Sequence, residues 1–348
     1  MIAIDGGRGG GQVLRTALTL AALTTEAVRI DGVRGARDDP GLRPQHRAGV
    51  RVLAALTDAD VDGDAVGSTE VSLEPTRTPN GTVDIDLQTA GSLPLLFETV
   101  LPLGVAAAGT IRVTATGGTD VRWSPTIGYQ RRVKVPMLER AGHDTAIAVK
   151  RSGFYPVGGG LATLAVRPAE PTPLEVVDRG ELRQLEVYSK ASEDLADADV
   201  AERQRDGLRE ALDAHATAIA RTEVRYVETA CPGTSVLLVA RYEGGVAGFD
   251  ALGERGTPAE VVGAEAAEAF VAFDDGAGAV DHHLADQLLV PLALGGGVVS
   301  APAVTDHVRT NAAVIEAFGV EVGVEDHPDG GALLRVDDPL EASTRSTV

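Results

Sequence analysis

The same order of structural elements recurs three times along the chain of 348 residues, although the copies are only weakly similar. Each unit has a glycine-containing turn, an apolar helix, a strand rich in β-branched residues, an amphipathic helix and a further strand. Helices that alternate with strands in this way predict an α/β fold of the layered α+β kind, with three β-α-β-α-type repeats in one large domain. An all-helical or all-strand fold is thereby excluded.

The bounds of the predicted elements follow from hydrophobic periodicity. The predicted helices of the three repeats are 12–24 and 45–56, 92–108 and 129–141, and 283–294 and 310–318. The predicted strands are 2–4, 27–30, 110–116, 145–149, 161–166 and 297–301, and a closing strand that begins at 320–324.

A segment of different composition separates the second repeat from the third. Residues 168–180 are rich in proline and acidic side chains, which indicates a linker. Beyond it, periodicity predicts a β-α-β-β-α series with the elements 182–188, 199–215, 223–228, 235–242 and 258–273. We therefore predict a small inserted domain at 181–276, and a large repeat-built domain made of 1–180 and 277–348.

The charge balance is strongly acidic, with 51 Asp and Glu against 31 Lys and Arg, a net charge of −20. The lysines are only Lys134, Lys150 and Lys190, and 3% of the residues are aromatic. This composition predicts a halophilic protein, because at molar salt the Debye length is only ~3 Å and an acidic surface repels itself little. The alternative is an ordinary acidic protein. Screening also weakens repulsion from nucleic acid, so local arginine clusters decide such binding.

Three features bear on the compartment. Cys231 is the single cysteine, so neither an intramolecular disulfide nor a cysteine metal cluster can form. The first residues lack the basic and apolar regions of a secretory signal. The uncharged run 288–305 contains two prolines and three consecutive glycines, which favours a buried segment over a membrane helix. We expect a cytoplasmic protein without a membrane partner.

Two motifs point to phosphate binding. Residues 5–12, DGGRGGGQ, open a predicted helix, where glycines let the backbone approach a phosphate and the helix N-terminus offers free N–H groups. The spacing matches neither a Walker A loop nor a dinucleotide-binding fingerprint, so a flexible turn is the alternative. Residues 33–47 hold four arginines, whose guanidinium groups match phosphate oxygens. Surface ion pairs with Asp38 and Asp39 would also explain these arginines.

Two further motifs have a less specific chemistry. The sequence RSGFYPVGGG at 151–160 predicts a tight loop at a strand edge, with glycines that serve the structure. The segments 281–287 and 305–311 contain three histidines near carboxylates, but their spacing fits a zinc site poorly. His307, beside Asp306, is a candidate nucleophile or acid–base group, and a structural histidine is the alternative.

Taken together, the four motifs resemble those of the RNA 3′-terminal phosphate cyclases. GFYPVGGG is similar to the signature loop of that family, RGARDDPGLRPQH to its arginine segment, HLADQL to its nucleotide-binding helix, and His-x-x-Thr-Asn to its catalytic segment. The resemblance covers the whole chain, including the insert. It implies three repeats around a pseudo-threefold axis, and an ATP-dependent enzyme that converts an RNA 3′-phosphate to a 2′,3′-cyclic phosphate.

The resemblance also implies roles for individual residues. His307 would attack the α-phosphorus of ATP, AMP would pass to the RNA 3′-phosphate, and the neighbouring 2′-hydroxyl would displace AMP. The implied catalytic residues are His307, Arg15, Arg34 and Arg37. The implied nucleotide-binding residues are Glu98, Pro125, His283, Leu284, Ala285, Asp286 and Gln287. The implied residues for the RNA phosphate are Gln12, Arg34, Arg37 and Gln45. Mg²⁺ or Mn²⁺ on the pyrophosphate would complete the charge balance, with Glu98 as a candidate ligand.

The chain departs from the family pattern in three places. The N-terminal loop of the family usually reads Asp-Gly-x-x-Gly-Glu-Gly-Gly-Gly-Gln. The loop here is two residues shorter and lacks the glutamate, which leaves the metal dependence open. Glu98 stands where the family often has glutamine, and His283 stands where it usually has tyrosine. The smaller ring of His283 can still stack on a base.

Two other functions stay open at this point. A catalytically inactive relative acting in ribosomal RNA processing would share the fold, although the retention of His307 and Arg15 favours an enzyme. An enolpyruvyl-type transferase has a related repeat architecture, but fold likeness alone is a weak argument. Because aromatic residues are few, we expect recognition of the terminal phosphate and ribose rather than of bases. The sequence leaves the oligomeric state open.

Overall fold

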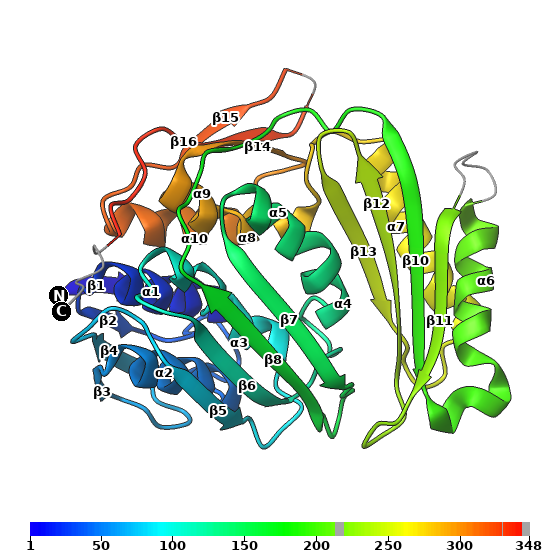
Figure 1. Cartoon of the computed structure of the whole chain (residues 1–348), viewed down its shortest axis with the longest axis horizontal. Coiled ribbons are helices and arrows are strands. Elements are labelled where there is room, and N and C mark those ends of the chain that lie inside the picture. The colour runs from blue at the N-terminus through cyan, green and yellow to red at the C-terminus, as the bar shows by residue number, and fades with distance from the viewer. Residues whose placement is uncertain (213–218, 329, 343–348) are drawn as a thin grey trace.

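The computed structural model describes residues 1–212, 219–328 and 330–342. Within these ranges the strands form four sheets of four strands, and every sheet consists of a parallel pair extended by two antiparallel pairings. Three sheets belong to the repeats and the fourth to the insert (Figure 1). The α/β class and the three repeats are thereby confirmed. Each repeat has the order β-α-β-α-β-β, so the first and third repeats end in more strands than were predicted, whereas both closing strands of the second repeat were predicted.

The first repeat builds its sheet around a buried helix. The strands of this sheet, in spatial order, are β1 (Ile2–Asp5), β2 (Val28–Asp31), β4 (Glu70–Glu74) and β3 (Asp60–Asp62). Its helices are α1 (Gly11–Thr24) and α2 (Pro44–Thr57). Apolar side chains such as Leu18 and Leu20 bury α1 on most of its faces. The helix ends at Thr25, which takes the left-handed conformation.

The second repeat shows how proline and local hydrogen bonding break predicted helices. Its strands, in spatial order, are β5 (Thr82–Asp86), β6 (Ile111–Gly117), β8 (Gly160–Arg167) and β7 (Asp144–Arg151). The predicted helix 92–108 is two pieces, α3 (Leu93–Glu98) and a 3₁₀ segment with Pro102, which lacks an N–H to continue the helix. The predicted helix 129–141 is α4 (Ile127–Tyr129) and α5 (Val135–Arg140), joined by the π-helical turn η2 (Gln130–Lys134).

The third repeat is split in sequence by the insert. Its strands, in spatial order, are β9 (Leu174–Val176), β14 (Gly297–Ala301), β16 (Ala332–Val336) and β15 (Gly323–Asp326). Its helices are α8 (His282–Gln287), α9 (Leu289–Gly295) and α10 (Asp306–Ala317). The linker predicted at 168–180 was wrong in part, because β9 lies within it and pairs in parallel with β14. Leu174 and Val176 are buried there, and three residues are too few to show periodicity.

The insert has one strand more than predicted. Its elements are β10 (Leu182–Ser192), α6 (Val200–Leu212), β11 (Ile219–Val227), β12 (Thr234–Tyr242), β13 (Val246–Leu252) and α7 (Ala259–Asp274). The prediction missed β13 because four glycines surround or interrupt it. The last residues of the predicted helix 199–215 lie outside the described residues.

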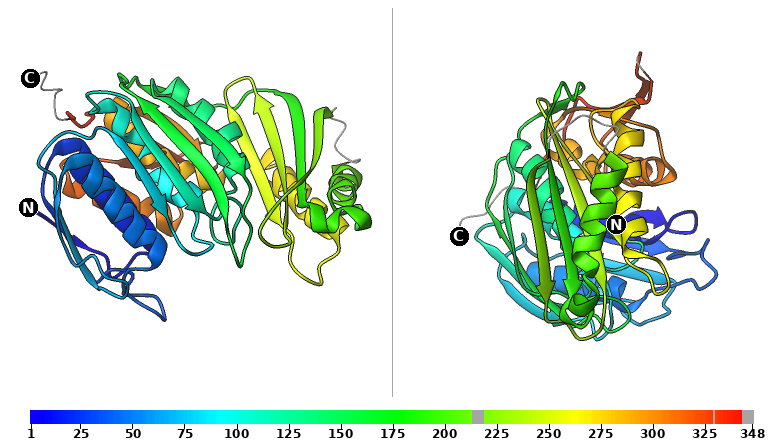
Figure 2. Two further views of the ribbon diagram at one scale, coloured as in Figure 1. Left: turned by 60° about the horizontal axis from the view of Figure 1, so that its bottom comes forward. Right: turned by 90° about the vertical axis from the view of Figure 1, so that its right-hand side faces the viewer.

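The insert has a hydrophobic core of its own. Residues from β10, β12, α6 and α7, among them Leu238 and Phe270, form this second cluster. Alternate residues of β12, such as Leu237 and Val239, instead join the main core, which runs through all three repeats. The insert sheet therefore has helices on one face and packs on the second repeat with the other, and Figure 2 shows the insert at one end of the molecule. No helix in the described part of the chain has the length and apolar character needed to cross a membrane.

Candidate active site

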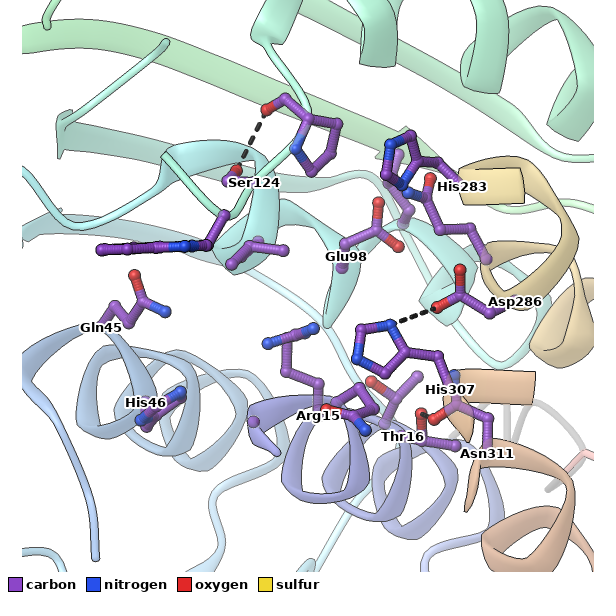
Figure 3. Close-up of a pocket in the computed structure, with 18 of the residues that line it drawn as sticks. Arg15, Thr16, Gln45, His46, Glu98, Ser124, His283, Asp286, His307 and Asn311 are labelled. Atoms are coloured by element: carbon purple, nitrogen blue, oxygen red, sulfur yellow. Dashed lines mark hydrogen bonds and ion pairs between the residues drawn. The ribbon is translucent and has the colours of Figure 1, made fainter. Parts of the chain in front are cut away.

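A cavity of about 800 Å³ opens where helices of the three repeats meet. Residues of α1 and the arginine segment form one side, α3 and the loop before α4 form another, and α8 and α10 close the third (Figure 3). Eleven of the predicted site residues line it. They are Gln12, Arg15, Arg34, Arg37, Gln45, Glu98, Pro125, His283, Asp286, Gln287 and His307.

Two predicted nucleotide-binding residues are placed elsewhere by the structure. The side chains of Leu284 and Ala285 are fully buried in the main core and are not among the described residues that line the cavity. Helix geometry explains this difference. His283, Asp286 and Gln287 recur at the spacing of one helix face, and the two apolar residues between them point to the opposite side.

The glycine turn brings the start of α1 against charged and imidazole side chains. A Cβ on Gly11 would lie 2.4 Å from Nε2 of His46 and 3.1 Å from an Nη atom of Arg15. A Cβ on Gly10 would lie 3.1 Å from an Nη atom of Arg37. Side chains are excluded here, and α1 has no side-chain cap on its first N–H groups. The turn can therefore offer backbone N–H groups to an anion.

The arginine segment divides into paired and unpaired guanidinium groups. Arg43 forms an ion pair with Asp39, and Arg47 forms one with Asp64 at 3.2 Å. Arg34 and Arg37 have no carboxylate within ion-pair distance among the described residues, and both line the cavity. Arg34 is fixed instead by donating hydrogen bonds to the carbonyls of Asp39 and Gly41, at 2.8 and 3.0 Å. The ion-pair interpretation thus holds for Arg43 with Asp39, and Arg34 and Arg37 stay candidates for phosphate binding.

His46 was not predicted as a site residue, yet it lies among these arginines. Its Nδ1 accepts a hydrogen bond from the backbone N–H of Arg43 at 3.1 Å, which closes the N-terminal turn of α2. Burial, followed by the positive charges of Arg15, Arg34 and Arg43, lowers the pKa of His46 to about 3. The imidazole is therefore neutral at physiological pH and does not add to the positive charge. The spacing of His46 after the helix-starting Pro44 is the signal in the sequence.

Glu98 forms an ion pair with Lys134 at the floor of the cavity. The side chain of Lys134 is only 3% exposed, and Gln130 donates to the other oxygen of Glu98 at 3.3 Å. Because a buried charge is stable only when paired, the two residues depend on each other. Sequence reasoning missed Lys134, although the rarity of lysine in this chain marked it.

His307 and Asp286 face each other across the cavity from α10 and α8. Nδ1 of His307 lies 4.0 Å from Oδ2 of Asp286. Burial lowers the pKa of His307, and Arg15, Arg37 and His283 lower it further, whereas Asp306 raises it. Burial raises the pKa of Asp286 to about 6, and the negative charge of Glu98 contributes to this rise. At neutral pH the pair therefore consists of a neutral imidazole and a largely ionised carboxylate.

Hydrogen bonds fix the helices that carry these groups. Oγ1 of Thr16 donates to Oδ1 of Asn311 at 3.0 Å, which joins α1 to α10. Asp281 caps α8 by accepting from the backbone N–H groups of His283 and Leu284, and Tyr129 donates to it at 2.8 Å. The ring of His283 packs edge-on against that of Tyr129 at 6.3 Å. His283 and Pro125 line the same cavity, as a site for a planar base requires.

Trp123, the single tryptophan, lies at the rim of the cavity with 92% of its surface exposed. Its backbone takes the left-handed conformation, with φ of 59°, which few bulky residues adopt. An exposed indole offers a stacking surface, so the sequence-based conclusion from the low aromatic content was incomplete. The signature loop, in contrast, packs away from the cavity, where Phe154 contacts Gly233 and Cys231 of the insert.

Comparisons with known proteins agree with this geometry. A family model described as RNA 3′-terminal phosphate cyclase matches residues 6–324. A protein named RNA 3′-terminal phosphate cyclase from Halobacterium salinarum is 44% identical over 345 residues, which cover 96% of this chain and 99% of that protein. A protein of the same name from Thermococcus gammatolerans is 40% identical over 320 residues, covering 91% of this chain and 92% of its own. The chain belongs to the RNA 3′-terminal phosphate cyclase family.

The match to the cyclase family extends through the insert, since residues 6–324 include all of it. Among solved structures, the enolpyruvyl transferase NikO from Streptomyces tendae aligns with a TM-score of 0.27 and 20% identity. That alignment covers 46% of this chain and 31% of the transferase. So weak a likeness bears on neither the fold nor the activity of this cyclase-family chain.

Proposed function

We propose that this chain is an ATP-dependent RNA 3′-terminal phosphate cyclase that forms a 2′,3′-cyclic phosphate through an adenylyl-histidine and an RNA-adenylate intermediate. One observation carries the proposal. A neutral imidazole, that of His307, shares a cavity with the unpaired guanidinium groups of Arg34 and Arg37. A nucleophile placed beside uncompensated positive charge suits attack on a phosphorus atom of an anionic substrate.

The shape and charge of the cavity suit ATP. The rings of His283 and Pro125 offer apolar surfaces for adenine, and the glycine turn offers N–H groups for phosphate. Arg15 is partly buried, and this burial lowers its pKa while the charges of Glu98 and Asp286 raise it. Phosphate oxygens placed between these arginines would neutralise a site that is otherwise rich in positive charge.

In the first step, Nε2 of His307 attacks the α-phosphorus of ATP. Nδ1 faces Asp286, so Nε2 is the ring nitrogen left with a free lone pair. A bond forms between Nε2 and phosphorus, the bond from that phosphorus to the oxygen shared with the β-phosphate breaks, and pyrophosphate leaves. The imidazolium that results keeps its proton on Nδ1, where the carboxylate of Asp286 stabilises the positive charge. Asp286 is therefore a positioning residue.

The later steps use the same imidazole and arginines. An oxygen of the RNA 3′-phosphate attacks the adenylyl phosphorus, the bond to Nε2 breaks, and His307 returns to its neutral form. The neighbouring 2′-hydroxyl then loses its proton, and its oxygen attacks the 3′-phosphorus and displaces AMP. Arg34 and Arg37 hold the terminal phosphate in place, so that ring closure needs little beyond positioning. Gln12 and Gln45 line the same side of the cavity.

The residues of the cavity also fit a divalent cation. The carboxylates of Glu98 and Asp286 face the same space, and the charge of Glu98 helps to raise the pKa of Asp286. Mg²⁺ binds through one or two protein carboxylates together with substrate phosphates, and no cluster of three or more potential protein ligands occurs among the described residues. When bound, Mg²⁺ or Mn²⁺ would neutralise the departing pyrophosphate.

The same proposal covers the organisation and setting of the enzyme. The second hydrophobic core supports an inserted domain at 181–276, which packs with its other face on a catalytic domain at 1–180 with 277–348. RNA with a 3′-terminal phosphate and ATP are the proposed substrates, and we expect the reaction to take place in the cytoplasm. The exposed indole of Trp123 at the rim suits stacking on the terminal base without reading its identity.

The test is transfer of label from α-labelled ATP to the protein, in high-potassium buffer with Mg²⁺ or Mn²⁺ and without RNA. We expect acid-labile label on the wild type and none on His307→Ala. His282→Ala is the matched control, since His282 is exposed on the same helix as His283 but does not line the cavity. RNA with a 3′-phosphate is then added, and conversion to the cyclic end is measured. Folded wild-type protein that takes up no label with either metal would instead support the inactive relative.

A further inference from the structure

A second cavity, of about 540 Å³, lies between the second repeat and the insert. Its walls come from η2, β7 and the start of β8 on one side, and from β10, β11 and β12 on the other. Figure 1 shows the two sheets that carry these strands side by side. The cavity shares no lining residue with the cavity of His307. The mechanism proposed above leaves it without a role.

This cavity, called the basic groove below, reverses the charge balance of the chain. Its lining includes six cationic side chains and four acidic ones, whereas the whole chain has 31 of the first kind and 51 of the second. The cationic residues are Arg131, Arg132, Lys150, Arg151, Lys190 and Arg225. Of the three lysines in the chain, two line the basic groove and Lys134 lines the catalytic cavity. Lysine in this chain therefore occurs only at cavities.

Most of this positive charge is not neutralised by the protein. Lys190 pairs with Asp120 at 2.6 Å, and Arg225 pairs with Glu223 at 2.7 Å. The other four cationic residues have no carboxylate within ion-pair distance in the part of the chain that the structure describes. Burial, followed by the charges of Arg132 and Arg225, lowers the pKa of Arg131, so these guanidinium groups repel one another. A bound polyanion would relieve that repulsion.

The loop of residues 120–126 connects the basic groove with the catalytic cavity. Trp123, Ser124 and Pro125 line the catalytic cavity, and Asp120 and Thr126 line the basic groove. One short loop is therefore the common wall of both. A chain that leaves the catalytic cavity past Trp123 and crosses this loop enters the basic groove.

We propose that the basic groove binds the sugar–phosphate backbone of the RNA nucleotides that precede the 3′-terminal phosphate. This inference rests on the proposed function, which requires that an RNA chain leads away from His307. Guanidinium and ammonium groups bind phosphate oxygens without reading bases. Two guanidinium groups, of Arg132 and Arg221, already lie over the ring of Tyr188, at 3.8 and 5.5 Å. Base stacking on that ring is thereby disfavoured, so binding in the groove is independent of sequence.

The test compares a short with a long substrate in a variant of the groove. The double variant Arg131→Gln with Lys150→Gln removes two unpaired charges. Its matched control is Arg112→Gln with Arg209→Gln, two exposed arginines that line neither cavity. The substrates are a dinucleotide and a single strand of about 12 nucleotides, within the range that single-strand sites cover, both with a 3′-phosphate. KM for cyclisation and anisotropy-based affinity are measured over the range of KCl in which circular dichroism shows the chain folded.

We expect the groove variant to weaken affinity for the long strand about fivefold to tenfold and to leave KM for the dinucleotide unchanged. The slope of log affinity against log salt should become less negative by about 1.4, since each phosphate contact on a single strand contributes about −0.7 to it. The proposal would be overturned if the groove variant binds the long strand as tightly as the wild type does. It would also be overturned if the variant is impaired equally on the long strand and the dinucleotide. If the groove instead binds an acidic protein segment, the groove variant would keep the wild-type affinity for the long strand. Tight, groove-dependent binding of the long strand without cyclisation would contradict the proposed function instead, and would leave the groove assigned to RNA.

Discussion

Nδ1 of His307 in α10 lies 4.0 Å from Oδ2 of Asp286 in α8. Folding of the third repeat brings these two helices together. Their pKa values move toward each other, since burial lowers that of His307 and raises that of Asp286 to about 6. Just above this pH, the carboxylate is ionised and the imidazole is neutral. The arrangement suits a nucleophile whose positive charge appears only after attack.

Adenylylation should therefore weaken as the pH falls through about 6, because protonated Asp286 no longer stabilises the imidazolium. We expect Asp286→Asn to lower the rate by at least about tenfold at pH 7.5 and to move the acidic limb to the lower pH at which His307 itself becomes protonated. The measurement is the initial rate of label transfer from ATP between pH 5 and pH 8, for the wild type and the variant. An acidic limb that stays near pH 6 in Asp286→Asn would assign the titration to another group.

The same substitution should make the protein more stable. The folded-state pKa of Asp286, about 6, exceeds the unfolded value of 3.8, so its contribution to stability falls as the pH rises from about 4 to about 6 and stays low above. At pH 7 we expect Asp286→Asn to gain on the order of 2 kcal/mol in free energy of unfolding, and near pH 4 to gain little. Denaturant unfolding at both values checks this. Asp38→Asn, at an exposed carboxylate of the arginine segment, should leave stability unchanged at both.

Lys134 and Glu98 should behave as one unit. Lys134→Met leaves a buried carboxylate without its cation, and we expect a loss of about 3–5 kcal/mol in free energy of unfolding. The double variant Lys134→Met with Glu98→Gln should recover most of that loss, because no unpaired charge remains. Denaturant unfolding of the two single variants and the double variant measures the coupling. Additive effects would show that the two charges do not depend on each other.

Trp123→Ala should impair the use of RNA and spare the chemistry on ATP. The indole is almost fully exposed, so its removal should not change the melting temperature. Loss of one stacked base costs about 1–3 kcal/mol, which corresponds to at least a fivefold increase in KM for RNA. Trp123→Phe should restore most of the affinity. A normal KM for RNA in Trp123→Ala would exclude stacking at the rim.

Strong apolar periodicity allowed several helices and strands of the repeats to be predicted from the sequence. The helices at 12–24 and 45–56 and the strand at 297–301 lie within one residue of the observed elements, because each buries a regular apolar face. The strands β3, β4 and β5 went unpredicted because aspartate and glutamate occupy their exposed positions, and these residues are rare in strands. The acidic side chains that predict a halophile thus also made these three strands hard to predict, among them the edge strands β3 and β5.

Site residues that belong to a recognised motif could be predicted from the sequence. Site residues that only the tertiary structure brings together could not. The resemblance to the family placed Arg15, Arg34 and His307 in a common site, and all three line one cavity. His46 ends the quoted arginine segment but was not singled out in it, and Lys134 enters the cavity from another repeat without any motif. The basic groove joins the second repeat to the insert across a long stretch of sequence, so only tertiary structure brings its charges together.

The interruption of the third repeat has a consequence for the order in which the protein is made. β9 is synthesised before the insert, but its partner β14 emerges only after more than a hundred further residues, and β16 later still. During translation the first two repeats and the insert can form their own sheets while β9 waits unpaired. The helix that carries His307 docks against α1 only when the chain is nearly complete. A nascent or truncated chain therefore holds Arg34 and Arg37 without a docked His307, and under the proposed mechanism it cannot consume ATP before it is finished.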